Sequence, residues 1–136
     1  MVGLSESQML KLPEGIVGIQ RTQNVQELVM LYSKSDVLIN PTYADTFPTV
    51  NLEALACGIP VITYDTGGSP EAIDQYTGIV VPQGDVKALS EAIIKIKDNP
   101  MSSEKCRARA EKYFDKDKCF RQYIELYEDL LKREKG

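Results

Sequence analysis

Histidine and tryptophan are both absent from this 136-residue sequence. Without histidine, the described sequence cannot supply a Ser-His-Asp or Cys-His catalytic arrangement, or a histidine-ligated metal site. Cysteine is scarce, and Cys57, Cys106 and Cys119 form no CxxC pair, which argues against a zinc site and against a disulfide framework. A general base here would have to be a carboxylate, and a reducing, cytoplasmic location fits the cysteine content.

Long apolar runs and an extended basic face are missing too. No apolar run approaches the roughly 18 residues of a membrane span, and no signal-peptide pattern is present. The net charge is −4, and residues 1–80 carry only three Lys or Arg against nine Asp or Glu, so nucleic-acid binding is not expected. The basic cluster over 105–121 is expected to be a solvated helix face, with peripheral contact to acidic lipid headgroups as the less favoured alternative.

Short apolar segments alternate with helical patterns along the chain. The segments typical of strands are 16–19, 37–39, 60–64 and 78–81. Helices are predicted from Asn24 to about 32, from near Pro48 to 57, after Asp85, over 103–113 and over 117–133. This order indicates an α/β fold with a Rossmann-like, mostly parallel sheet flanked by helices. We expect residues 1–136 to form one partial domain, with the last helix, about 117–133, as an appendage.

Three loops follow predicted strands, at the end of a parallel sheet where ligands bind. They are 40–48, 65–69 and 82–85. The first loop leads into a helix whose opening N–H groups, at Thr49, Val50 and Asn51, suit an anion such as a diphosphate.

Two carboxylates flank this helix start. Asp45 lies before it, and Glu53 lies about one turn into it, where each could accept hydrogen bonds from hydroxyl groups. A nucleotide-sugar has hydroxyls on both sides of its phosphates. The alternatives stay open: Asp45 as an Asx-turn residue, and Glu53 as an ordinary position in a largely apolar helix.

The second loop contains Thr66, Gly67 and Gly68, and the two glycines allow positive φ or close backbone approach. A plain tight turn is the more common explanation of this pattern. Ser69 and Pro70 are predicted to start the next helix, with Ser69 as its N-cap. Tyr43 and Phe47 could pack on a base or a sugar, but core packing is the simpler expectation.

The stretch DTFPTVNLEALACGIPVITYDTGGSPEAI resembles the donor-site segment of family-4 retaining glycosyltransferases of the GT-B fold. In that family an acidic residue precedes a Gly-Phe-Gly-like turn, and a glutamate follows eight positions later; here Asp45 and Glu53 fill those places. The helix then ends in the family pattern E-A-x-A-x-G-x-P-V-I. The resemblance extends over about residues 15–100.

The resemblance implies transfer of a sugar from a nucleoside diphosphate to an acceptor, with retention and without a metal or other cofactor. Glu53 would bind the ribose and Asp45 the transferred sugar, while backbone groups of Phe47, Thr49 and Val50 would hold sugar and diphosphate. The full set of implied donor-binding residues is Asp45, Phe47, Pro48, Thr49, Val50, Glu53, Thr66, Gly67 and Gly68. No residue is assigned to catalysis or to a metal.

The sequence also departs from the family pattern. Asp45 replaces the usual Glu, and Thr46 and Pro48 stand where glycines are usual, so one phosphate-binding N–H is lost at Pro48. No Lys or Arg occurs between Ser35 and Val81, whereas the family uses an Arg and a Lys from an earlier segment. Family members also carry an acceptor-binding domain before the donor-binding one, and we do not expect residues 1–14 to contain it. We therefore expect a truncated chain, or a fragment that pairs with another chain, with no transferase activity alone.

Three alternatives remain at this point. They are a stand-alone module that binds a nucleotide or sugar phosphate without turnover, a UDP-sugar epimerase, and a purely structural interaction domain. The absence of histidine counts against the epimerase. A sheet lacking a central strand would expose strand edges, so self-association is expected. The sequence does not identify the donor nucleotide, the sugar or the acceptor.

Overall fold

The computed structural model describes residues 1–134, which fall into two compact units, Met1–Lys34 and the chain from Ser35 onward. The prediction that residues 1–136 form one partial domain stays a prediction. Each unit is described by itself.

The first unit holds two short helices. Helix α1 (Glu6–Met9) begins with a capping box between Ser5 and Gln8. Helix α2 (Val25–Ser33) confirms the helix predicted from Asn24. The Asn24 side chain caps it by accepting a hydrogen bond from the Glu27 N–H at 2.8 Å.

The strand predicted over 16–19 is wrong. These residues form only one isolated parallel bridge, between Ile19 and Val2. Gly3 follows Val2 with a φ of +87°, which turns the chain out of the extended conformation after a single paired residue. An apolar segment without a continuous partner strand forms no ladder.

The second unit confirms the α/β prediction. Its sheet consists of β1 (Leu38–Asn40), β2 (Val61–Tyr64) and β3 (Gly78–Val81), in that order and all parallel. The register aligns Ile39 with Ile62 and Ile62 with Ile79. Every residue of the central strand β2 is buried, as expected when helices cover both faces of a sheet.

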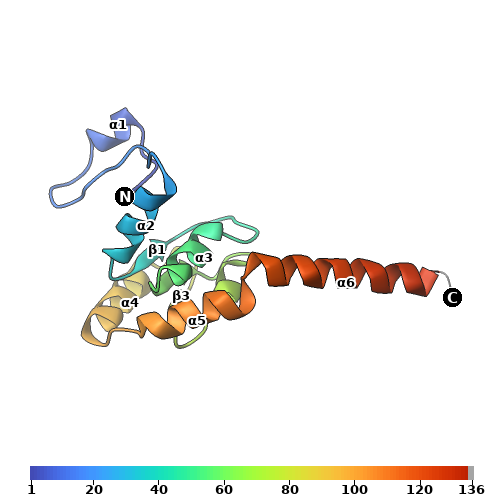
Figure 1. The fold of residues 1–136 in the computed structure, drawn as a ribbon. Coiled ribbons are helices and arrows are strands. Elements are labelled where there is room, and N and C mark those ends of the chain that lie inside the picture. The colour runs from blue at the N-terminus through green and yellow to red at the C-terminus, as the bar shows by residue number, and fades with distance from the viewer. Residues whose placement is uncertain (135–136) are drawn as a thin grey trace. The chain divides into compact units, whose positions relative to one another are not determined.

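Helices accompany the sheet in the described part of the second unit (Figure 1). They are α3 (Thr49–Ala56), the 3-10 helix η1 (Ser69–Ala72), α4 (Val86–Asp98), α5 (Ser103–Tyr113) and α6 (Lys116–Glu134). The predicted cap of α4 is confirmed, since the Asp85 carboxylate accepts from the Ala88 N–H at 2.9 Å. The cap predicted for the helix after loop 65–69 is wrong: Gly68 is the N-cap of η1, and Ser69 lies inside its first turn.

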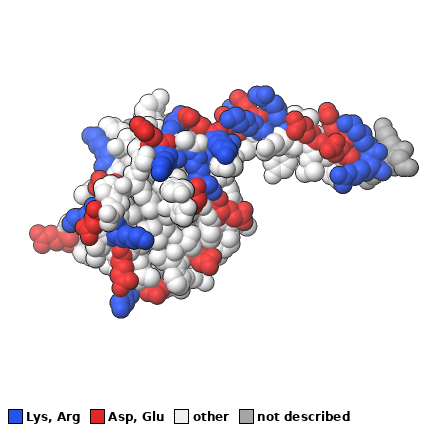
Figure 2. Space-filling view, turned by 90° about the horizontal axis from the view of Figure 1, so that it is seen from below, with Lys and Arg blue, Asp and Glu red and all other residues white. Residues whose placement is uncertain are grey.

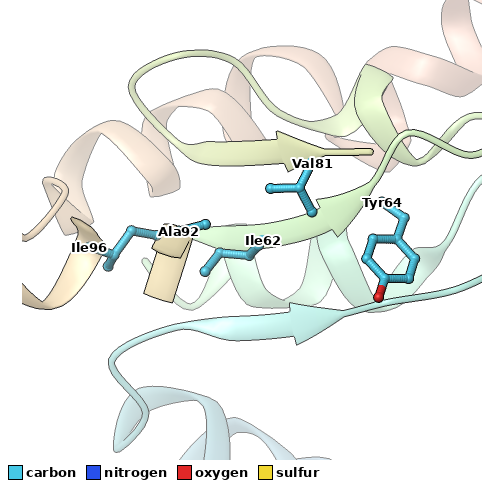
Figure 3. Close-up of a cluster of buried hydrophobic side chains, with 5 residues drawn as sticks. All are labelled: Ile62, Tyr64, Val81, Ala92 and Ile96. Atoms are coloured by element: carbon cyan, nitrogen blue, oxygen red, sulfur yellow. The ribbon is translucent and has the colours of Figure 1, made fainter. Parts of the chain in front are cut away.

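A hydrophobic core lies between the sheet and α4. Figure 3 shows Ile62, Tyr64 and Val81 on the strands beside Ala92 and Ile96 of α4. This core holds β2 and β3 in place, and with them the loops that follow their carboxyl ends.

The basic cluster over 105–121 is only partly a solvated face. Figure 2 shows Lys and Arg interspersed with Asp and Glu along α6. On α5, however, the Arg109 side chain is only 17% exposed and binds backbone carbonyls of another segment. The helical charge pattern alone does not show this, because the partners of Arg109 lie far away in the sequence.

Candidate functional site

The three loops that follow the strands meet at the carboxyl end of the sheet. The Gln83 side-chain amide, in the third loop, donates a hydrogen bond to the backbone oxygen of Tyr43 in the first at 2.9 Å. The Tyr43 ring stands edge-on to Tyr64 at 5.6 Å between centroids, yet remains exposed. The meeting of these loops places the residues predicted to bind a ligand around one end of the sheet.

The two glycines of loop 65–69 let it lie directly against loop 40–48. Gly67 has a φ of +51°, and a Cβ atom on it would overlap the backbone oxygen of Asp45. A Cβ on Gly68 would overlap the backbone oxygen of Thr46 in the same way. The close backbone approach allowed by these glycines is therefore to the neighbouring loop.

An open hollow lies where these two loops touch. Its lining consists of Ala44, Asp45, Thr46, Thr66 and Gly67. The Asp45 Oδ1 accepts a hydrogen bond from the Phe47 N–H at 3.1 Å, which makes the Asx-turn that the sequence had left open. Asp45 itself is exposed, while the Thr66 hydroxyl oxygen is buried without a hydrogen-bond partner in the described part of the chain.

Helix α3 starts beside this hollow with an uncapped first turn. Pro48 is its N-cap and makes no side-chain capping bond. Because the first N–H groups of a helix have no acceptor within the helix, those of Thr49 and Val50 are available to a ligand. Both residues are exposed, so this end of α3 is an accessible region of partial positive charge.

Glu53 occupies a different hollow from Asp45. It lies on the side of α3 that faces α5, where its neighbours around the hollow include Arg107 and Phe114. The Phe47 ring packs against Phe114 at 6.0 Å between centroids, so this aromatic side chain serves packing. The structure thus groups Asp45, Thr66 and Gly67 together but does not place the two predicted carboxylates in one hollow.

A buried polar network beneath the loops was missed at the level of sequence. Asn51, fully buried on α3, accepts from the Asn40 side-chain amide at 3.0 Å and donates to the Ser69 backbone oxygen at 3.5 Å. The Thr63 hydroxyl donates to the Asn40 backbone oxygen at 3.0 Å. The signal was available, since Asn51 is an amide in an otherwise apolar helix and requires partners.

A more enclosed cavity, of about 480 Å³, lies at the opposite end of the sheet. It is bordered by Val37 and Pro60, which precede β1 and β2, and by Ile96 and Met101. Ligands of open parallel sheets bind at the carboxyl ends of the strands. We therefore place the candidate site at the loops, although the hollow there is more open.

Two features are absent from the described residues. In this part of the chain, no group of three or more acidic or cysteine side chains is arranged to hold a metal ion. No helix within the described residues combines the length and apolar character needed to cross a membrane.

Comparison with known proteins identifies the family. A model of "Glycosyl transferases group 1" matches residues 5–113. The chain belongs to this glycosyltransferase family. The match includes all three loops of the candidate site, and it confirms the resemblance drawn from the sequence.

Individual relatives of this group 1 glycosyltransferase chain are much longer. The chain is 30% identical over 132 residues to N-acetyl-alpha-D-glucosaminyl L-malate synthase of Bacillus anthracis, covering 93% of this chain and 34% of that protein. Sucrose-phosphate synthase from Thermosynechococcus elongatus superimposes with a TM-score of 0.78 at 30% identity, over 93% of this chain and 33% of that one. Anabaena HepE, solved in complex with UDP, superimposes at 0.70 with 21% identity, over 83% and 31%. The chain therefore spans about a third of these proteins.

Proposed function

We propose that this chain is the donor-binding part of a glycosyltransferase that moves a sugar from a nucleoside diphosphate to an acceptor, with retention and without a metal. The observation that carries the proposal is the family match across residues 5–113, which spans the uncapped start of α3 and the loops around it. The UDP in the Anabaena neighbour supports a nucleotide as part of the donor.

The diphosphate would lie at the start of α3. Its charge would be met by the N–H groups of Thr49 and Val50 and by the positive end of the helix dipole. No Lys or Arg occurs between Ser35 and Val81 to assist them. Donor binding by this chain alone is therefore expected to be weak, and sugar transfer is expected to need cationic groups that this stretch does not supply.

The hydroxyl groups of the donor would be held by the two acids. Asp45, exposed in the hollow with Thr66 and Gly67, would accept from the transferred sugar. Glu53 would accept from the ribose, which requires the nucleoside to pass along the side of α3 that faces α5. Phe47 would contribute through its backbone, because its ring is engaged with Phe114.

The three free cysteines fit a reducing, cytoplasmic location.

The test is a titration of UDP, GDP and their glucose and mannose derivatives into the isotope-labelled chain, followed by amide NMR shifts. Shifts at Thr49, Val50 and Gly67 that Glu53→Ala abolishes would support the proposal. Glu91→Ala is the matched control, since Glu91 is an exposed helix glutamate on α4 that pairs with Lys87 at 3.9 Å. Shifts that are the same in both variants would contradict the role of Glu53, and robust sugar transfer by the purified chain would contradict its inactivity alone.

A further inference from the structure

Arg109, on α5, turns inward onto the segment that follows loop 65–69. Its Nε donates a hydrogen bond to the Ala72 backbone oxygen at 2.7 Å. Its Nη2 donates to the backbone oxygens of Glu71 at 3.1 Å and Ile73 at 3.3 Å. One guanidinium thus binds three consecutive carbonyl groups at the end of η1. Because this helix is so short, no later N–H group within it donates to these carbonyls.

The remaining side of the guanidinium is fixed as well. Its Nη1 donates to the Asp74 Oδ2 at 2.8 Å. The other carboxylate oxygen of Asp74 accepts from the Tyr76 N–H at 3.0 Å and from the Thr77 hydroxyl at 2.9 Å, so the carboxylate cannot rotate freely. The Arg109 side chain is only 17% exposed, and charge-assisted bonds in such a place are stronger and more directional than those at the surface.

The same end of α5 also holds the first loop of the candidate site. The Arg109 guanidinium lies 6.0 Å from the Phe114 ring centroid, and that ring packs on Phe47. Gly68, the N-cap of η1, lies against the backbone oxygen of Thr46. The two loops that border the hollow are therefore both anchored to α5, one through Phe114 and the other through Arg109.

We propose that Arg109 is a positioning residue, which fixes residues 65–73 in the conformation that the donor site requires. This inference rests on the proposed function, because it assumes that the hollow between the two loops holds part of the donor. Arg109 would not touch the donor. Its effect would pass through η1 to Gly67 and Thr66.

The chain offers a matched control on the same helix. Arg107 also donates to a distant backbone oxygen, that of Ala56 at 2.6 Å, and pairs with Glu111 at 2.7 Å. Its side chain is 59% exposed, and Ala56 lies at the end of α3, away from loop 65–69. Arg107→Lys therefore perturbs one bond to a backbone carbonyl and one to a carboxylate without touching η1.

The experiment compares hydrogen exchange at single amides in the full chain and in the Arg109→Lys and Arg107→Lys variants. The reporters are the N–H groups of Ser69, Glu71 and Ile73, which donate within the turn at 3.1, 3.2 and 3.3 Å. A lysine cannot bind three carbonyls and a carboxylate in one plane. In Arg109→Lys we expect exchange at these amides to be about tenfold faster or more, the factor for losing one charge-assisted bond. The β2 amides in that variant, and the three reporter amides in Arg107→Lys, should keep their rates.

Nucleotide titration completes the test. If the wild-type chain binds UDP or GDP, Arg109→Lys should weaken that binding several-fold; equal affinity would overturn the positioning role. Unchanged exchange at the three reporters, or acceleration spread evenly over the chain, would also overturn it. If Arg109→Lys does not fold, Asp74→Asn replaces it with the same reporters and the same criteria. Binding of neither nucleotide to the wild-type chain would contradict donor binding by this chain alone, and the exchange comparison would still decide whether Arg109 holds the loop.

Discussion

The Cα atom of Gly67 faces the backbone oxygen of Asp45 with no room between them for a side-chain carbon. The relationship joins two loops that follow different strands, and it fixes the shape of the hollow between them. If Gly67 served only to turn the chain, replacing it by another residue would cost no more than the backbone strain of a positive φ angle. Gly67 carries a second constraint, from the neighbouring loop.

Gly67→Ala should therefore destabilise the second unit by more than the roughly 1–2 kcal/mol that a left-handed φ costs an L-residue. Gly84→Ala is the control. Gly84 has a φ of +78°, but a Cβ there meets only the side chain of Tyr43, at 3.3 Å. Urea denaturation of both variants measures the difference. Equal losses of unfolding free energy would show that loop packing adds nothing at Gly67.

The network around Asn51 predicts a second effect. Asn51→Leu leaves the Asn40 side-chain amide without its acceptor inside the protein, which should lower the free energy of unfolding by about 1–3 kcal/mol. Asn40→Ala in the same background should then cost little more, because the two substitutions remove one interaction. A double-mutant cycle gives the coupling energy. Additive losses would show that the two amides act separately.

Local sequence patterns predicted most helices and strands of the second unit, because residues within or next to each segment determine where it starts and ends. Strands β1 to β3 are apolar runs bounded by turn residues, and α4 has both a capping aspartate and an apolar face. The strand expected over 16–19 failed for the opposite reason: its formation depends on a partner, and Gly3 turns that partner away after one residue.

The candidate site was predictable in its loops but not in its contacts. Motif spacing located Asp45, Thr66 and Gly67, which the structure brings together. It could not show that Glu53 faces α5, because that depends on how two helices pack. Arg109 was expected to be solvated, and its principal acceptor lies 37 positions away in the sequence, a separation that no local pattern encodes.

The Asp74 carboxylate should make the stability of the second unit depend on pH in the acid range. Burial raises the pKa of this group, but hydrogen bonds from Tyr76 and Thr77 and the nearby Arg109 charge outweigh burial and hold the pKa below its ordinary value. A folded-state pKa below the unfolded one means that the contribution to stability is fully present above about pH 4 and is lost as the pH falls through the folded value.

Asp74→Asn removes this titration. The difference in melting temperature between wild type and variant should be constant from pH 7 to about pH 5 and should shrink below pH 4. Glu91→Gln is a suitable control, since its exposed pair with Lys87 at 3.9 Å should change little. A wild-type advantage that grows on acidification would contradict the assignment.

Helix α6 should contribute little to the stability of the sheet and its covering helices. Its apolar residues Tyr127 and Leu130 are 64% and 47% exposed, and the helix makes few contacts with other elements. Leu130→Ala should therefore change the free energy of unfolding by no more than about 0.5 kcal/mol. The matched substitution Leu55→Ala, at a fully buried position of α3, should cost about 2–5 kcal/mol. A large loss at Leu130 would show that α6 is covered in solution, and sedimentation would then show whether by a second copy.

The cysteines should differ sharply in reactivity. Cys106 is fully buried, and this burial, helped by the charge of Asp74, raises the pKa of its thiol to about 11. Since only the thiolate reacts, the fraction available at pH 8 is roughly 200-fold lower than for an ordinary thiol with a pKa near 8.5. Iodoacetamide labelling followed by peptide mass spectrometry should therefore modify the half-buried Cys119 well before Cys106. In urea sufficient to unfold the chain, the two should react at similar rates. Early labelling of Cys106 under native conditions would mean that α5 separates from α3 far more often than its buried position implies, and the anchoring of both loops by α5 would have to be reconsidered.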